Sequence, residues 1–173
     1  MAIHIVIDGY NLIRQSPSLS TIDALDLQRG REELIKRLSQ YQKIKRHPIT
    51  VVFDGWRSEN PHEAKEKERG INIIFSRYGE KADDIIKRIA AKERERIVVV
   101  TSDHEVADFS QRHGAAIINS RDFEMRMEIA FYSYIKGIEE YNQRPSRIGT
   151  KKKGSPKRLS KRERRNKVKI RKL

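Results

Sequence analysis

Residues 3–9 have the sequence Ile-His-Ile-Val-Ile-Asp-Gly, a run rich in β-branched side chains that ends in an aspartate and a glycine. A run of this kind favours a buried strand, and Asp-Gly favours a turn directly after it. The pattern returns at residues 49–53, which are followed by Asp54-Gly55, and at residues 97–101, which are followed by Ser102-Asp103. The chain therefore predicts three buried strands that each end next to an aspartate.

Helical segments alternate with these strands. Strands are predicted at residues 3–7, 49–53, 71–75, 97–101 and 115–118, and helices at 21–45, 80–93, 104–112 and 120–136. Thr21 and Ser120 are the predicted caps of the first and last of these helices, and residues 56–70 are predicted to be a loop with at most one helical turn. Apolar strands that alternate with helices indicate a parallel sheet covered on both faces, which is an α/β doubly wound sandwich.

Charge is distributed unevenly along the 173 residues. The chain has 38 Lys+Arg and 24 Asp+Glu, a net charge of +14. Residues 142–173 contain 15 basic residues and only one acidic residue, Glu163, so residues 1–141 contain 23 of each sign. We therefore predict a neutral domain over 1–141 and a basic C-terminal arm over 142–173, an arrangement typical of proteins that bind nucleic acid or another polyanion.

Within the arm, Ser160 and Glu163 have the spacing of a capping box and predict a helix over about 161–172. The apolar stripe of this helix is thin, so we expect it to stay off the domain and to order on RNA, with 142–159 flexible. A solubilising tail is the alternative. The predicted RNA-binding side chains are Lys151, Lys152, Lys153, Lys157, Arg158, Lys161, Arg162, Arg164 and Arg165.

Composition excludes several classes of site. The chain has no cysteine, which rules out disulfides, thiolate metal sites and cysteine nucleophiles. No apolar run approaches the roughly 20 residues of a membrane span, so we expect no membrane partner and a cytoplasmic location. Neither a Gly-x-Gly-x-x-Gly fingerprint nor a Walker A loop is present.

Three aspartates follow predicted strands: Asp8, Asp54 and Asp103. The carboxyl ends of parallel strands meet at one edge of a sheet, where ligands bind in α/β folds, so these carboxylates are expected to converge. Taken singly, each has an ordinary explanation, because aspartate is common in turns.

A further acidic pair, Asp83 and Asp84, lies at the start of the predicted helix 80–93. The helix dipole alone would favour acidic residues there. Asp83 borders the apolar stripe of that helix, whereas Asp84 has the spacing to pair with Arg88 on the surface. We therefore favour Asp83 as a site residue and keep Asp84 as the second choice.

A carboxylate cluster without cysteine suits Mg²⁺ or Mn²⁺, which prefer oxygen ligands. A divalent cation would relieve the mutual repulsion of the carboxylates, polarise a phosphoryl oxygen and activate water. Together with the basic arm, the cluster points to metal-assisted hydrolysis of phosphodiester bonds.

Four segments, each with apolar residues next to one or two aspartates, follow one another along the chain. They are Ile7-Asp8-Gly9-Tyr10-Asn11-Leu12-Ile13, Val51-Val52-Phe53-Asp54-Gly55, Ala82-Asp83-Asp84-Ile85-Ile86 and Val100-Thr101-Ser102-Asp103. As a set they closely resemble the bacterial YacP-like branch of NYN domains, relatives of PIN-domain nucleases, over roughly residues 1–130. The resemblance implies a PIN-like three-layer sandwich with parallel strand order 3-2-1-4-5, a divalent metal in an acidic pocket, and RNA cleavage.

By matched position, the resemblance places Asp8, Asp83 (with Asp84) and Asp103 around the metal. In the predicted nuclease Asp84 would assist by ligation or by orienting the attacking water. Asn11 would position Asp8 or the phosphate, and Asp54 would lie at the rim of the pocket or behind it.

These observations predict a metal-dependent endoribonuclease that acts on RNA in processing or decay, with the ribosome as one candidate platform. The alternative is a non-catalytic RNA- or ribosome-binding factor on a nuclease-like fold, and a DNA nuclease is a weaker third. Tyr10, Trp56 and Tyr78 are candidates for base stacking, although each is also consistent with ordinary packing. The oligomeric state is left open.

Overall fold

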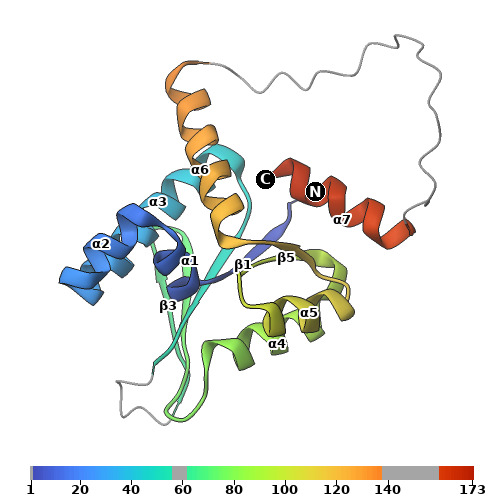
Figure 1. Cartoon of the computed structure of the whole chain (residues 1–173), viewed down its shortest axis with the longest axis horizontal. Helices are drawn as coiled ribbons and strands as arrows, with labels where there is room; N and C mark the ends of the chain where they lie inside the picture. Colours follow the sequence, from blue (N-terminus) through green and yellow to red (C-terminus); the bar gives the residue numbers. More distant parts are fainter. Residues whose placement is uncertain (1, 56–61, 138–159) are drawn as a thin grey trace.

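The computed structural model describes residues 2–55, 62–137 and 160–173. These residues form a six-stranded sheet with the strand order β3-β4-β2-β1-β5-β6 (Figure 1). The strands are β1 (His4–Asp8), β2 (Ile49–Phe53), β3 (Ala64–Glu68), β4 (Ile71–Phe75), β5 (Ile97–Val100) and β6 (Ala116–Ile118). All neighbouring pairs are parallel except β3 and β4, which are antiparallel.

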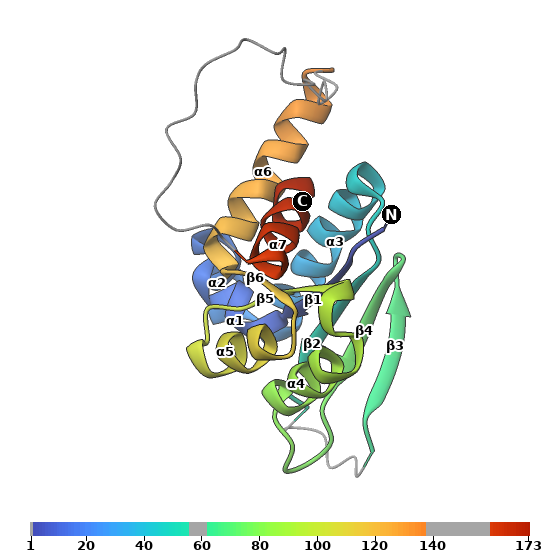
Figure 2. The ribbon, with the colours of Figure 1, turned by 90° about the vertical axis from the view of Figure 1, so that its right-hand side faces the viewer.

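Helices cover both faces of the sheet (Figures 1 and 2). They are α1 (Gly9–Gln15), α2 (Pro17–Leu25), α3 (Leu27–Lys45), α4 (Ala82–Glu93), the 3₁₀ turn η1 (Arg94–Arg96), α5 (His104–Arg112), α6 (Ser120–Ile135) and α7 (Lys161–Lys172). One core cluster joins α1, α3 and α6 to one face of the sheet, and a second joins α4 and α5 to the other. The predicted mixed α/β sandwich is therefore confirmed.

The central strands are buried on both faces because their side chains alternate between the two core clusters. In β1, Ile5 and Ile7 contribute to the first cluster and Val6 to the second. This two-sided burial explains why the central strands are continuously apolar rather than alternating. The parallel strands have the expected order, since β4, β2, β1, β5 and β6 are the predicted strands 3-2-1-4-5.

The loop predicted over 56–70 is wrong for residues 64–68, which form β3 at the edge of the sheet. A two-residue turn, Arg69-Gly70, joins β3 to β4, and both of its residues have positive φ, as type I′ hairpins require. The sequence of β3, Ala-Lys-Glu-Lys-Glu, has no apolar alternation because the strand is largely exposed. Charged side chains of this kind are how edge strands avoid pairing with other chains.

The single helix predicted over 21–45 is also wrong. The segment contains two helices, α2 and α3, which break at Asp26. Ser16, not Thr21, caps α2, and its Oγ accepts a hydrogen bond from the Leu19 backbone N–H. Asp26 adopts an extended conformation and caps α3 by accepting from the Gln28 and Arg29 backbone N–H groups. The short helix α1 was not predicted.

The later helices lie close to their predicted ranges. Helix α5 has the predicted bounds, whereas α4 begins two residues later than predicted. The cap of α6 is Asn119 rather than Ser120, because the Asn119 side chain accepts a hydrogen bond from the Asp122 backbone N–H at 2.8 Å.

The C-terminal helix α7 packs on the domain, which overturns the expectation that its apolar stripe is too thin to hold it. Leu173 is only 2% exposed and belongs to the first core cluster, with Ile170 packed beside it. Tyr41 Oη donates a hydrogen bond to the Leu173 carbonyl at 2.5 Å. Residues 142–159, for which flexibility was expected, lie outside the described residues.

Polar contacts place α7 at the amino-terminal edge of the sheet. Arg165 forms an ion pair with Glu95, directly before β5, and Asn166 donates to the Ala115 carbonyl, directly before β6. In Figure 2, α7, drawn in red, is seen between α6 and α3, and Tyr41 of α3 bonds to Leu173 directly after it.

Candidate active site

Four aspartates come together at the opposite, carboxyl-terminal edge. Asp8 is the last residue of β1, Asp54 follows β2, and Asp103 follows β5. Because β2, β1 and β5 are adjacent and parallel, their ends lie side by side. Asp83 reaches the same edge from the first turn of α4, which packs against β1 and β2.

The charges of these carboxylates act on one another. Burial raises the pKa of the Asp8 carboxyl to about 6, and the negative charges of Asp83 and Asp54 add to this effect. Burial also raises the pKa of Asp83, as do the charges of Asp103 and Asp54. The mutual repulsion shows that the four side chains share one electrostatic environment.

Asp8 is the most deeply placed of the four, with 8% of its surface exposed. Its Oδ1 accepts a hydrogen bond from the Asn11 backbone N–H at 3.2 Å, which caps α1. Its Oδ2 accepts from Thr101 Oγ1 at 3.3 Å. Thr101 Oγ1 in turn accepts from the Asp103 backbone N–H at 3.1 Å, so Thr101 links two of the carboxylate-bearing residues.

The side chain of Asn11 joins three elements at this edge. Its Oδ1 accepts hydrogen bonds from the Ser102 backbone N–H at 2.8 Å and from Ser120 Oγ at 2.7 Å. Ser102 Oγ also accepts from the Ser120 backbone N–H. Asn11 therefore holds the turn after β5, which carries Asp103, against α1 and the start of α6.

Thr101, Ser102 and Ser120 were not predicted as part of the site. The available signal was the pair of hydroxyl residues directly before Asp103, at the end of the most apolar strand. Hydroxyl side chains at strand ends often bond to nearby backbone groups, so this signal alone does not indicate which partners they take.

Asp54 has a different local role. Its Oδ1 accepts a hydrogen bond from the Ala82 backbone N–H at 2.6 Å, at the amino end of α4. The Asp54 carboxylate thus holds the helix that carries Asp83.

The glycines of the two Asp-Gly pairs are required by close packing. A Cβ on Gly9 would lie 2.3 Å from the Phe53 ring, and a Cβ on Gly55 would lie 1.9 Å from the Ser76 carbonyl oxygen. Glycine is therefore needed at both positions because a larger side chain would clash with the end of a neighbouring strand. This close packing is a stronger reason than turn propensity.

Asp84 is exposed, and the ion pair expected with Arg88 is absent from the described contacts. Asp84 Oδ2 instead accepts a hydrogen bond from the Lys81 backbone N–H as part of the α4 cap. Arg88 pairs with Glu80 and Glu63. The structure thus separates the two adjacent acids, with Asp83 coupled to the other carboxylates and Asp84 on the surface.

Of the aromatic candidates for stacking, Tyr10 is a core residue. It is 7% exposed and packs edge-on against Phe53 at a centroid distance of 5.1 Å. Tyr78 is 72% exposed, and Trp56 lies outside the described residues.

The donor set fits a hard divalent cation, because carboxylate oxygens are the ligands that Mg²⁺ and Mn²⁺ prefer. In the part of the chain that the structure describes, no three acidic or histidine side chains are close enough to enclose a metal ion. Mg²⁺ does not require such a cage, because it keeps several water ligands and takes one or two carboxylates. Burial is the main cause of the raised pKa values of Asp8 and Asp83, and the charges of neighbouring aspartates add to it, so a cation at this edge would favour their charged forms.

The predicted RNA-binding residues fall into two groups. Lys151, Lys152, Lys153, Lys157 and Arg158 lie outside the described residues, whereas Lys161, Arg162, Arg164 and Arg165 are exposed on α7. The structure does not bring α7 next to the carboxylates, since the helix lies at the amino-terminal edge of the sheet.

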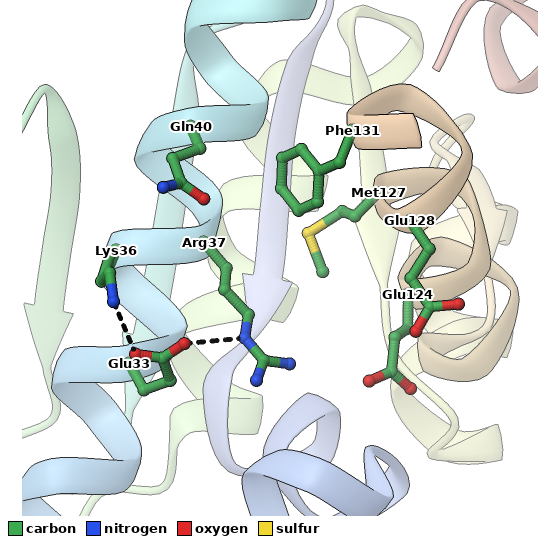
Figure 3. A pocket seen from close by; sticks show the side chains of 8 residues that line it. All are labelled: Glu33, Lys36, Arg37, Gln40, Glu124, Met127, Glu128 and Phe131. Atoms are coloured by element: carbon green, nitrogen blue, oxygen red, sulfur yellow. Dashed lines mark hydrogen bonds and ion pairs between the residues drawn. The ribbon is translucent and has the colours of Figure 1, made fainter. Parts of the chain in front are cut away.

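A separate cavity of about 240 Å³ lies between α3 and α6 (Figure 3). Glu33, Lys36 and Arg37 line it from α3. Burial alone would raise the pKa of Glu33, but hydrogen bonds from Arg37 and Lys36 outweigh it and hold that pKa below its usual value. None of the four coupled aspartates lines this cavity, so it is not part of the candidate active site.

A mostly parallel sheet covered on both faces by helices, with carboxylates gathered at the carboxyl ends of its central strands, defines a doubly wound α/β protein. The sequence profile of the YacP-like NYN domain matches residues 5–172. The chain therefore belongs to the YacP-like NYN domain family, and the match includes α7. The resemblance noted from the four sequence segments is confirmed.

Individual relatives agree with this assignment. The chain is 30% identical over 103 residues to the uncharacterized protein YacP of Bacillus subtilis (strain 168), and this match covers 58% of the chain and 60% of that protein. A crystal structure of Rae1 (YacP) from Bacillus subtilis has a TM-score of 0.64 at 27% identity, covering 80% of both chains. A mutant of the same protein has a TM-score of 0.65 at 24% identity, covering 78% of this chain and 80% of its own.

Within the described ranges, no helix combines the length and apolarity needed to cross a bilayer.

Proposed function

We propose that this protein is a divalent-metal-dependent endoribonuclease that hydrolyses RNA phosphodiester bonds in RNA processing or decay. The observation that carries the proposal is that Asp8, Asp54, Asp83 and Asp103 lie at the same carboxyl-terminal edge of the sheet, in a chain of the YacP-like NYN family. Mutually repelling carboxylates cost stability, so a fold that gathers them is best explained by a cation that compensates their charge.

In this proposal Asp8, Asp83 and Asp103 surround Mg²⁺ or Mn²⁺, with one or two of them as direct ligands and the rest acting through water ligands of the cation. When bound, such a cation polarises a phosphoryl oxygen and lowers the pKa of water, which makes hydrolysis at neutral pH accessible. The hydrogen bond from Thr101 holds Asp8 in place, and the Asn11 side chain holds the turn that carries Asp103. Asp54 fixes the start of α4 and thereby the position of Asp83.

The proposed partner is RNA, free or on the ribosome, and the proposed location is the cytoplasm. The net charge of +14 lies in residues 142–173, a density that attracts phosphates. Because α7 is at the edge opposite to the carboxylates, its basic side chains would bind a segment of RNA away from the bond that is cut.

The test is an RNA cleavage assay with the full chain. Cleavage is expected with Mg²⁺ or Mn²⁺, to stop with a chelator, and to stop in Asp103→Asn while thermal unfolding shows that the variant is folded. Asp108→Asn, an exposed position on the same helix α5, is the matched control and is expected to cleave normally. Cleavage by folded Asp103→Asn at the wild-type rate would contradict the site assignment.

The second candidate is a non-catalytic RNA- or ribosome-binding factor. The observation that favours it is the distance in the fold between the basic helix and the carboxylates, which means that binding by α7 does not require cleavage. This candidate predicts RNA binding that depends on α7, with no RNA cleavage at any Mg²⁺ or Mn²⁺ concentration.

A further inference from the structure

A second cavity at the carboxyl-terminal edge adjoins the coupled aspartates. It has a volume of about 410 Å³, within the range of small-molecule sites. Its walls come from the end of α1, the turn after β5, the first part of α5, β6, and the start of α6. Asp103 lines this cavity and also raises the pKa of Asp83 by its charge, so the cavity opens next to the candidate metal site.

The rim of the cavity carries side chains that bind phosphate and ribose. Arg121, His104 and Gln15 are exposed on the rim, on three different elements. In the part of the chain that the structure describes, no acidic side chain forms an ion pair with Arg121. Its guanidinium is therefore available for a phosphate, which it can bind through two parallel hydrogen bonds.

Two apolar side chains form part of the wall, beside the polar residues Thr101, Ser102 and Asn119. Ala107 on α5 and Ile117 on β6 line the cavity, and both are only partly buried. Ile117 packs against the second core cluster, so its position is set by the fold rather than by a ligand. A flat base can lie against these two side chains while a phosphate contacts Arg121 on the rim.

We propose that this cavity holds one unpaired nucleotide of RNA, the neighbour of the scissile phosphodiester, with Arg121 bound to its phosphate. The inference rests on the proposed function for the position of the scissile bond. The site selects single-stranded RNA because the bases of a duplex are paired and stacked, and one nucleotide cannot enter a cavity without leaving the stack. Arg121 is thus a specificity residue and not a ligand of the metal.

The binding experiment uses the full chain with a chelator, so that no cleavage occurs. A single-stranded tetranucleotide is titrated, and methyl resonances of Ala107 and Ile117 are followed by NMR. These two methyl groups are expected to shift on binding, whereas the Ile89 methyl groups on α4 are not. If the methyl resonances of Ala107 and Ile117 do not shift when the tetranucleotide binds, the proposal is overturned.

Arg121→Ala is expected to weaken tetranucleotide binding about tenfold, since it removes a charge-assisted contact. The matched control is Arg126→Ala on the same helix, because Arg126 does not line the cavity, and its affinity should remain at the wild-type value. Equal affinities for wild type and Arg121→Ala overturn the proposal. A stable RNA hairpin that contains the same four nucleotides in its base-paired stem should bind more weakly, and a hairpin whose affinity also falls tenfold in Arg121→Ala overturns the single-strand selection.

Two further measurements distinguish a failure of the nucleotide site from a failure of the proposed nuclease function. A free nucleoside monophosphate that binds as tightly as the tetranucleotide would make the cavity a mononucleotide site and overturn the RNA assignment. With Mg²⁺ present, Arg121→Ala is expected to raise the KM for cleavage about tenfold and to change kcat much less, because the contact exists before and during the reaction. If wild type binds the tetranucleotide through Arg121 but cuts no RNA, the proposed function fails while the nucleotide site stands.

Discussion

The two edges of the sheet carry opposite charge. At the carboxyl-terminal edge, four acidic side chains interact around Asp8, whereas the amino-terminal edge is covered by the basic helix α7. The five residues of β1 separate the two edges by about 16 Å at the usual rise per residue. An RNA molecule that touches both edges must therefore extend across the body of the protein, so the two regions can contribute separately to cleavage and to affinity.

The largest expected effect distinguishes the adjacent acids of α4. We expect Asp83→Asn to lower the rate of RNA cleavage by about a hundredfold or more, because it removes a proposed metal ligand. Asp84→Asn should lower the rate by less than about threefold, because Asp84 is exposed and only caps the helix. Rate measurements under single-turnover conditions check both. Equal losses in the two variants would remove the distinction that the structure draws between them.

The second prediction concerns the folding stability that the protein loses when the Asp8 carboxyl is ionised. The pKa of Asp8 is about 6 in the folded state against 3.8 for an unperturbed aspartate, so the folded state binds the proton more tightly. Stability is then lost as the pH rises from about 4 to 6, by about 2 to 3 kcal/mol in total. Asp8→Asn should therefore unfold at higher denaturant concentration than wild type at pH 7.

This stabilising effect should vanish below about pH 3, where Asp8 is protonated in both states. Denaturation in a metal-free buffer at several pH values gives the measurement. A wild-type protein that is as stable as Asp8→Asn at pH 7 would mean that burial and the neighbouring acids do not raise the pKa of Asp8 in the metal-free protein.

At the amino-terminal edge, the third prediction concerns the attachment of α7. Leu173→Ala should lower the free energy of unfolding by about 2 kcal/mol, the low end for a buried leucine, because Leu173 lies at the margin of the core. The turnover of bound RNA should stay the same. Urea denaturation measures the first quantity, with Val168→Ala, an exposed position on the same helix, as the control.

The smallest effect is expected from charge removal on α7. Replacing Lys161, Arg162 and Arg164 by alanine should weaken RNA binding about tenfold at moderate salt and leave kcat unchanged. Each lost phosphate contact should reduce the slope of log affinity against log salt by about 0.7 for single-stranded RNA. Arg165 is left in place because it pairs with Glu95. An unchanged salt dependence would exclude α7 from the RNA interface.

Much of the sheet and the edge where the acids meet could be predicted from local pattern. Apolar runs followed by aspartate mark the parallel strands, because a strand buried on both faces tolerates few polar residues until it leaves the sheet. Asp8, Asp54 and Asp103 were singled out on this basis, and Asp83 because it borders the apolar stripe at the start of its helix. Helix ends were harder, as Asp26 and Asn119 show, because several Ser, Thr, Asp and Asn residues near a boundary can each serve as the cap.

The amino-acid sequence by itself determined the strand order through the family resemblance, the neutral body and basic arm, and the acids that end the strands. These features depend on residues that are close together in the chain or on motifs of known arrangement. Only the tertiary structure decided that β3 is an edge strand, that Asn11 binds the turn after β5, and that α7 docks opposite to the acids. Each of these depends on contacts between distant residues, such as Tyr41 with Leu173, whose free energy is set by packing and not by local propensity.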